Sequence, residues 1–201
     1  VDCAVGQYTH TAGSSQCIQC TAGRYVSVVG SDQLSDCIGC GAGTYTAMTG
    51  SDEASDCSNT CVAGSRTEDA AGSAFASTGA ALCTLCAAGR YSSDATGSAD
   101  CIGCALGKHS ADPIGAVACI GCAVGKYIAV TGSDAAADCI DCGAGKYVGV
   151  TGSDGISDCI DCNAGRYTDV TGTGSLSDCI RCVIGKYVGV TGSNQATDCI
   201  D

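Results

Sequence analysis

A repeating pattern of cysteines constrains the fold of this chain more than any other feature. The most regular copies begin at Cys122, Cys142, Cys162 and Cys182, which are spaced twenty residues apart. Each of these residues is the second member of a Cys-x2-Cys pair. Internal similarity at a fixed short period is the signature of arrays and solenoids, in which one small unit is copied many times. The sequence therefore predicts a tandem array rather than a single globular domain.

We count each repeat from the second cysteine of one pair to the residue before the next. The ten resulting repeats are 1–19, 20–39, 40–60, 61–85, 86–103, 104–121, 122–141, 142–161, 162–181 and 182–201. The sequence Val1-Asp2-Cys3 resembles a pair without its first cysteine, and Cys199-Ile200-Asp201 resembles a pair without its second. From these two half-pairs we expect the array to continue on both sides or to abut another copy of itself.

Composition decides what holds such an array together. Leu, Ile, Val and Phe make up only 33 of the 201 residues, which is too few for one large apolar core. Twenty cysteines, about a tenth of the chain, mark a disulfide scaffold instead. The predicted fold class is therefore a small disulfide-rich array of short β-hairpins and loops. We expect an elongated, solenoid-like rod without a single core.

The net charge of −12 excludes several classes of partner. Nucleic acids and anionic membrane surfaces require patches of Lys and Arg, which this chain lacks. No run of about 18 apolar residues is present, so we expect no membrane span in this part of the chain.

Each repeat carries a glycine three residues after its second cysteine, and a tyrosine follows two residues later in eight repeats. A glycine at a fixed position indicates a positive φ or a close backbone approach. After the tyrosine, β-branched residues alternate, as Val148 and Val150 do, which predicts a short strand. A Thr-Gly-Ser-Asp segment then predicts a turn, and a short return leads to the next cysteine. The residues between the paired cysteines, such as Ile140-Asp141, are interpreted as a hinge.

The region from Cys57 to Cys122 departs from this pattern. Repeat 4 has a longer loop containing Phe75 and has Arg66 in the tyrosine position, while His109 takes that position in repeat 6. An Ala-rich segment from Ala70 to Ala81 is the one place where a helical pattern is conceivable. The long loop is either a tolerated insertion or a contact site for a partner.

Two kinds of chemistry fit the cysteines. The spacing Cys-x2-Cys-x16-Cys-x2-Cys is compatible with zinc ribbons. An unbroken ladder of pairs and the acidic charge favour disulfides, which stabilise by about 3 kcal/mol for a loop of about 15 residues. Joining each second cysteine to the following first cysteine closes every loop locally and leaves none unpaired. The predicted disulfides are Cys3–Cys17, Cys20–Cys37, Cys40–Cys57, Cys61–Cys83, Cys86–Cys101, Cys104–Cys119, Cys122–Cys139, Cys142–Cys159, Cys162–Cys179 and Cys182–Cys199.

The motif Cys-x2-Cys-x2-Gly-Lys-Tyr, a loop of about sixteen residues and a second Cys-x2-Cys resembles the ephrin-receptor-like cysteine-rich repeat. It is also similar to the first module of tumour-necrosis-factor-receptor repeats. The resemblance covers essentially the whole chain. It implies the same second-to-first disulfide pairing and a tyrosine packed within its own module. Long arrays of this type resemble those of large secreted or surface proteins of protists, including fibre-forming proteins.

We find no catalytic constellation and expect no enzyme activity, metal or cofactor. His10 and His109 are isolated and are interpreted as solvated residues. Asp154, Asp158 and Asp161 lack the spacing of a calcium loop and are interpreted as turn and surface acids.

Two further features recur in the repeats. A basic residue follows the fixed glycine, directly before the tyrosine position, and it either pairs with the Asp before the next cysteine or is solvated. The basic residues are Arg24, Arg90, Lys108, Lys126, Lys146, Arg166 and Lys186. The Ser and Thr residues of the turns permit O-linked glycans, whereas no Asn-x-Ser/Thr sequon occurs.

These observations predict an extracellular structural protein that self-associates head-to-tail into a fibre, surface coat or appendage. The alternative is a receptor-like ectodomain that binds a protein ligand through the irregular region 57–122. A zinc-binding array remains a third interpretation.

Overall fold

The computed structural model of the protein describes residues 2–11, 14–69, 78–95 and 100–201. Two compact units are formed: Val1–Ala87 with Tyr91–Ile102 and Ile114–Ala118, and Ala88–Arg90 with Gly103–Pro113 and Cys119–Asp201. In the described residues the only helical segments are single 3-10 turns. The fold is thus a small disulfide-rich array of two-stranded hairpins, as the cysteine pattern predicts.

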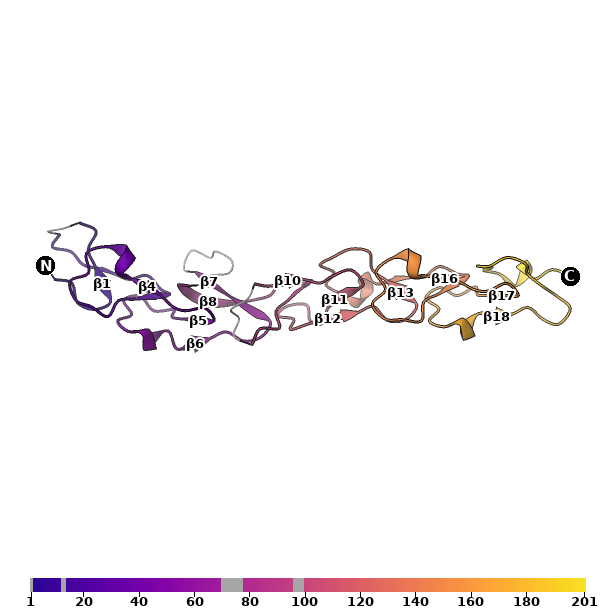
Figure 1. Ribbon diagram of the computed structural model, residues 1–201, viewed down its shortest axis with the longest axis horizontal. Coiled ribbons are helices and arrows are strands. Elements are labelled where there is room, and N and C mark those ends of the chain that lie inside the picture. Colours follow the sequence, from indigo (N-terminus) through magenta and orange to yellow (C-terminus); the bar gives the residue numbers. More distant parts are fainter. Residues whose placement is uncertain (1, 12–13, 70–77, 96–99) are drawn as a thin grey trace. The chain divides into compact units, whose positions relative to one another are not determined.

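Among its described residues, the N-terminal unit contains four antiparallel hairpins (Figure 1). Their strands pair β1 (Gln7–Tyr8) with β2 (Ile18–Gln19), β3 (Arg24–Tyr25) with β4 (Ile38–Gly39), β5 (Thr44–Tyr45) with β6 (Asn59–Thr60), and β7 (Ser65–Asp69) with β8 (Ala80–Leu85). Two 3-10 turns, η1 (Leu34–Asp36) and η2 (Ala54–Asp56), precede β4 and β6. Strands β9 (Arg90–Tyr91) and β10 (Ile102–Gly103) follow in the chain.

The C-terminal unit also contains four hairpins. They pair β11 (Lys108–Ser110) with β12 (Cys119–Gly121), β13 (Lys126–Tyr127) with β14 (Ile140–Asp141), β15 (Lys146–Tyr147) with β16 (Ile160–Asp161), and β17 (Arg166–Tyr167) with β18 (Ile180–Arg181). Its 3-10 turns are η3 (Ala136–Asp138), η4 (Ile156–Asp158), η5 (Leu176–Asp178) and η6 (Ala196–Asp198).

The hairpin register differs from the expected one. Lys146 pairs with Asp161 and Tyr147 pairs with Ile160. The hairpin strand β15 therefore ends at Tyr147, whereas the alternating residues predicted a strand in the segment after the tyrosine. Ile140 and Asp141 form strand β14, so the interpretation of this dipeptide as a hinge is wrong. The two residues between the paired cysteines form the second strand of the hairpin. This strand pairs with the basic-Tyr dipeptide of the same repeat.

The alternation at Val148 and Val150 has another origin. Tyr147 forms an isolated parallel bridge with Thr173 of the next repeat, and the Val148 amide donates to the Thr173 carbonyl at 3.1 Å. Val148 is therefore buried, whereas Val150 is 63% exposed. An extended segment that pairs with the next repeat shows the same alternation as a hairpin strand.

The apolar core is divided into small clusters, each centred on one disulfide. Cys142, Val148 and Cys159 form one such cluster, and Tyr127 of the preceding repeat packs against it. Tyr8 likewise joins a cluster of the following repeat, with Cys20, Val26 and Cys37. At both positions the expectation that the tyrosine packs within its own module is wrong. The tyrosine instead joins one repeat to the next.

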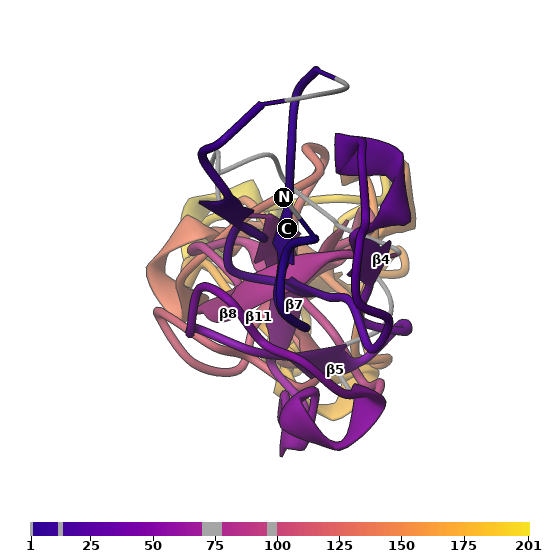
Figure 2. The same cartoon turned by 90° about the vertical axis from the view of Figure 1, so that its left-hand side faces the viewer.

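Successive turns point in opposite directions within a unit. In Figure 1 and Figure 2, η1 beside β4 and η2 beside β6 lie on opposite sides of the N-terminal unit. Repeats on the same side are therefore second neighbours in sequence. For the expected helical pattern at Ala70 to Ala81, residues 70–77 lie outside the described residues, and Ala80 begins strand β8.

Candidate functional site

The structure joins all twenty cysteines in ten local disulfides, and none is free. The bonds are Cys3–Cys17, Cys20–Cys37, Cys40–Cys57, Cys61–Cys83, Cys86–Cys101, Cys104–Cys119, Cys122–Cys139, Cys142–Cys159, Cys162–Cys179 and Cys182–Cys199. Their Cα–Cα distances of 5.5 to 5.9 Å lie in the ordinary range. Zinc binds thiolates, and this arrangement leaves none for it.

The junction between successive repeats is the most regular interaction of the molecule. Between repeats 7 and 8, Gly125 donates its N–H to the Val148 carbonyl and accepts from the Cys142 N–H, each at 2.8 Å. Ile128 donates to Ser153 at 3.1 Å, and Gly152 donates to Cys122 at 2.8 Å. Four backbone hydrogen bonds therefore connect the two repeats.

The same four bonds recur at the next two junctions. Between repeats 8 and 9, the donor–acceptor pairs are Gly145–Thr168, Val148–Thr173, Cys162–Gly145 and Gly172–Cys142. Between repeats 9 and 10, they are Gly165–Val188, Thr168–Ser193, Cys182–Gly165 and Gly192–Cys162. Each repeat thus presents one set of groups backward and a complementary set forward.

The fixed glycine also meets the repeat after next. A Cβ added to Gly125 would lie less than 3.0 Å from the carbonyl oxygen of Gly172, two repeats further on. Gly125 has φ +83°, so both reasons expected for a fixed glycine apply at this position. Asp161, on strand β16 between Cys159 and Cys162, makes a second contact with the repeat after next: Thr191 Oγ1 donates a hydrogen bond to Asp161 Oδ2 at 3.4 Å.

At Lys126 and Lys146 the recurring basic residue does not pair with the Asp before the cysteine. Lys126 and Lys146 instead bind the Asp of the partner strand: Lys126 Nζ lies 2.6 Å from Asp141 Oδ1, and Lys146 Nζ lies 2.5 Å from Asp161 Oδ1. The hydrogen bond from Lys146, together with its positive charge, lowers the pKa of Asp161. Arg166 donates to the Cys179 carbonyl at 2.7 Å. The sequence analysis identified the recurring cations but predicted the wrong aspartate as the partner of Lys126 and Lys146.

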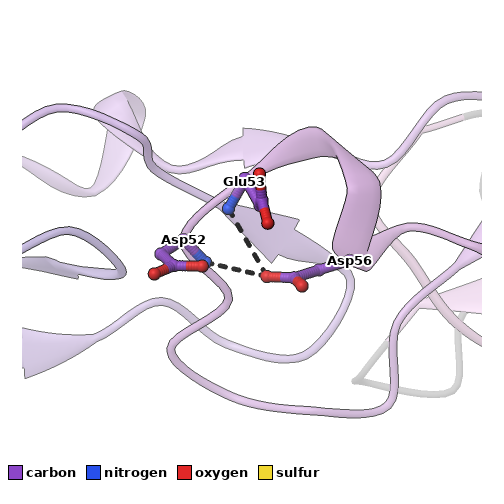
Figure 3. Close-up of side chains that lie close together, drawn as sticks. All are labelled: Asp52, Glu53 and Asp56. Carbon is purple, nitrogen blue, oxygen red and sulfur yellow. Dashed lines mark hydrogen bonds between the residues drawn. The ribbon is translucent and has the colours of Figure 1, made fainter.

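The Asp before the cysteine caps its own 3-10 turn. Asp56 Oδ2 accepts from the backbone N–H of Asp52 at 2.9 Å and of Glu53 at 3.4 Å (Figure 3). Asp158 Oδ2 binds Asp154 and Gly155 in the same way. The equivalent residues Asp138 and Asp198 do so as well.

These caps also decide where the candidate calcium ligands lie. Asp154 and Asp158 meet at one turn, whereas Asp161 belongs to the Lys146 pair on strand β16. Carboxylate oxygens of Asp52, Glu53 and Asp56 lie within 4.8 Å of one another, which is a common arrangement on an acidic surface.

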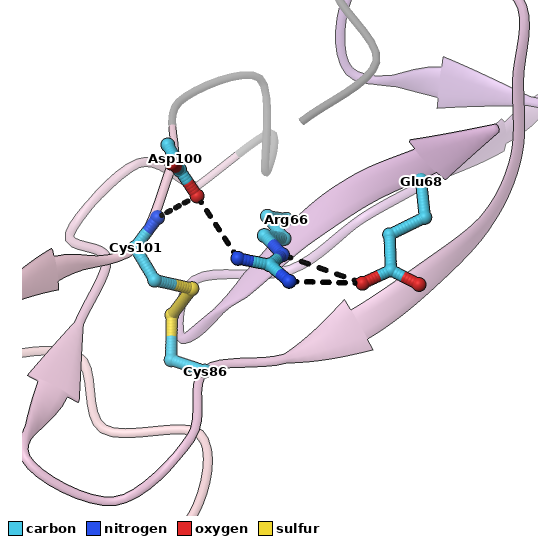
Figure 4. A network of polar contacts seen from close by, with 5 residues as sticks. All are labelled: Arg66, Glu68, Cys86, Asp100 and Cys101. Atoms are coloured by element: carbon cyan, nitrogen blue, oxygen red, sulfur yellow. Dashed lines mark hydrogen bonds and ion pairs between the residues drawn. A yellow bond between two sulfur atoms is a disulfide. The ribbon is translucent and has the colours of Figure 1, made fainter. Parts of the chain in front are cut away.

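Repeat 4 carries the main polar network outside the regular junctions. Arg66, in the tyrosine position, contacts Glu68 Oε1 at 3.1 Å and Asp100 Oδ1 at 3.2 Å (Figure 4). Burial alone lowers the pKa of Arg66, but its hydrogen bonds to Glu68 and Asp100 outweigh this and raise it. Asp100 also accepts from the Cys101 N–H at 2.7 Å. The network ties β7 to the disulfide Cys86–Cys101 of the next repeat. Phe75 of the same loop lies outside the described residues.

The two histidines differ in environment. His10 is exposed and packs edge-on against Tyr8 with ring centroids 5.3 Å apart. His109 is half-buried on strand β11, where it pairs with Ile120, and its Nδ1 lies 2.9 Å from the Ser110 carbonyl. The interpretation of His109 as solvated is therefore wrong, because it replaces tyrosine in the hairpin.

The hydroxyls of the turns fall into two groups. The Ser or Thr after the turn glycine is buried at Ser31, Ser51, Ser133, Ser153, Thr173 and Ser193. The Thr before that glycine is exposed at Thr49, Thr131, Thr151, Thr171 and Thr191. Only the second group is open to a modifying enzyme.

Comparison with known proteins identifies part of the array. Residues 1–37 and 130–179 match the family described as tyrosine-protein kinase ephrin type A/B receptor-like. No curated protein matches the chain. No helix of the described residues is long and apolar enough to cross a membrane.

Proposed function

We propose, on the premise that this chain is a tandem array of ephrin-receptor-like cysteine-rich repeats, that it is an extracellular structural protein. Disulfides at this density persist in oxidising surroundings, which supports secretion or display at a cell surface. Its function is mechanical rather than catalytic. Copies associate head-to-tail to form a fibre, a surface coat or an appendage.

The observation that carries this proposal is the junction between repeats. The same four backbone hydrogen bonds recur at three successive junctions, so the forward surface of a repeat is complementary to the backward surface of any regular repeat. A contact that joins two different surfaces of one subunit generates open filaments when it does not close into a ring. Disulfides confined to single repeats preserve each unit independently of its neighbours.

Electron microscopy of the purified chain tests this function. The oxidised protein is concentrated stepwise at physiological ionic strength, which screens the repulsion expected from a net charge of −12. We expect filaments that lengthen with concentration and disappear under reducing conditions. A chain that remains monomeric at every concentration contradicts assembly into fibres.

The alternative function is that of a receptor-like ectodomain with a ligand site in the irregular region 57–122. The observation that favours it is the network of Arg66 with Glu68 and Asp100, which interrupts the regular tyrosine pattern. The substitution Arg66→Ala would then abolish capture of a partner by the monomer and leave filament formation unchanged.

The exposed threonines before the turn glycines are proposed as sites of O-linked glycans, which appear as mass added to the polypeptide.

A further inference from the structure

The covalent path along the array bypasses most of each repeat. In repeat 8 the disulfide Cys142–Cys159 joins two cysteines that are 17 positions apart in the sequence and brings their Cα atoms to 5.7 Å. A pull along the chain therefore crosses this bond and enters Ile160-Asp161, the dipeptide that leads to Cys162. Residues 143–158 lie inside the closed loop and outside the path that transmits the force.

The backbone that carries the force is already extended. Cys159 has φ −74° and ψ 103°, which is extended, and Ile160–Asp161 is strand β16. Cys139 and Cys179 are extended in the same way, and strands β14 and β18 follow them. A β-strand rises about 3.3 Å per residue, close to the maximum of about 3.3–3.6 Å. Stretching therefore adds only roughly 1–2 Å to each of these linkers.

Hydrogen bonds and an ion pair brace the loops beside this path. Between repeats 8 and 9, Gly145 donates to the Thr168 carbonyl at 2.8 Å, and Gly172 donates to the Cys142 carbonyl at 2.9 Å. Lys146 holds the linker residue Asp161 against its own loop. The linker of two residues limits how far neighbouring loops can move apart. A pull on the chain thus loads the linkers and disulfides and has no covalent hold on the loop interior.

We infer that the array is a tension-bearing tether whose greatest length is set by its disulfides and linkers. A regular repeat contributes at most about 16 Å, of which 5.7 Å lies across the disulfide and about 10–11 Å lies between Cys159 and Cys162. From Cys3 to Cys199 the limit is about 155 Å with all disulfides intact, against about 690 Å for the reduced chain. This function rests on the proposed structural role but not on self-association, so a chain that stays monomeric contradicts the fibre and not the tether.

Single-molecule force spectroscopy of the full oxidised chain, held by tags at both ends, measures this limit. We expect a contour length of about 155 Å between Cys3 and Cys199 and no unfolding step beyond it. A thiol reductant then cleaves one disulfide at a time, because its thiolate attacks one sulfur and releases the other as a thiolate. Cleavage should add about 53 Å at Cys142–Cys159, with a sequence separation of 17, and about 70 Å at Cys61–Cys83, with a separation of 22.

A matched pair of variants in repeat 8 separates the tether from loop packing. Replacing both Cys142 and Cys159 by serine should lengthen the oxidised chain by about 53 Å, because the loop then enters the path. Gly145→Ala disturbs the same repeat, since its Cβ would lie less than 3.0 Å from the Gly192 carbonyl oxygen, but it should leave the contour length unchanged. Intact mass of the oxidised chains verifies the remaining disulfides.

Two outcomes overturn the tether. One is an oxidised wild-type chain that extends far beyond about 16 Å per repeat, because the loops would then carry load. The other is a Gly145→Ala chain that lengthens as much as the serine variant, because packing rather than the disulfide would then set the length. Filaments formed by a chain that fails either test would uphold the proposed function without the tether.

Discussion

The backbone of Gly145 in repeat 8 lies against the carbonyl of Gly192 in repeat 10, although the whole of repeat 9 lies between these residues in the sequence. A Cβ on Gly145 would lie less than 3.0 Å from that carbonyl oxygen. Gly165 has the same φ of +82° but no atom within 4 Å of an added Cβ. The contact of Gly145 with Gly192 shows that repeat 8 packs against its second neighbour as well as against its first. Comparing Gly145 with Gly165 therefore separates the cost of a positive φ from the cost of a steric contact between repeats.

Gly145→Ala is predicted to loosen repeats 8 to 10 more than Gly165→Ala does. Both substitutions place alanine at a positive φ, which costs about 1–2 kcal/mol. Only Gly145→Ala also forces the Gly192 carbonyl to move, which adds roughly 1–3 kcal/mol. Hydrogen exchange of the amides in residues 142–201 measures the difference. Equal acceleration of exchange in the two variants would show that the close approach contributes nothing.

The cap of the 3-10 turn makes a second prediction. Asp158 Oδ2 accepts from the Asp154 and Gly155 amides at 2.9 and 3.4 Å. Asp158→Ala is expected to destabilise this turn by about 1 kcal/mol, the typical cost of a lost side-chain cap. The amides of Asp154 and Gly155 should then exchange faster. Asp161→Ala serves as the control, because Asp161 lies on strand β16 and caps no turn. Unchanged protection in Asp158→Ala would refute the role of the cap.

The ion pair of Lys146 with Asp161 predicts a pH dependence. The hydrogen bond from Lys146 lowers the pKa of Asp161 in the folded chain. A carboxyl with a lowered native pKa contributes stability above its unfolded pKa of about 3.9, and the contribution is lost as pH falls through the native value. Carbon-13 titration of the Asp161 carboxyl should show its pKa rising in Lys146→Met and little changed in Lys146→Arg. A titration that is identical in all three chains would exclude the pair.

The repeat unit could be predicted from the sequence because cysteines, glycines and tyrosines recur at fixed offsets. The hairpin could not be placed correctly, since Val148 alternates with Val150 through pairing to Thr173 of the next repeat. Periodicity records which residues are buried but not which segment they pair with. Ile140-Asp141 looked like a hinge for the same reason: nothing local indicates its cross-strand partner, Lys126-Tyr127.

Contacts between a repeat and the repeat after next could not be predicted from the sequence either. A period of twenty residues describes one repeat, whereas Gly145 and Gly192 meet because successive turns face opposite sides. The partner of Lys146 was missed because three aspartates, Asp154, Asp158 and Asp161, lie in its repeat. Only the strand register selects Asp161 over Asp158. The cations were recognisable by their recurrence, but their partners required the structure.

Trypsin digestion without reductant tests the central claim, that every repeat is closed by a bond from its second cysteine to the next first cysteine. Lys126, Lys146 and Arg166 each lie inside one such loop. Cleavage there and after Arg181 would give peptides 109–126, 127–146, 147–166 and 167–181, joined through Cys122–Cys139, Cys142–Cys159 and Cys162–Cys179.

The account predicts that these four peptides stay in one covalently linked species, which also contains the peptides of residues 1–108 because Cys104–Cys119, Cys86–Cys101, Cys61–Cys83 and Cys20–Cys37 join them in turn. The peptides of this species separate only after reduction. If peptides 109–126, 127–146 and 147–166 instead appear separately before reduction, each with a bond inside its own Cys-x2-Cys pair, the local pairing is contradicted and with it the array described above.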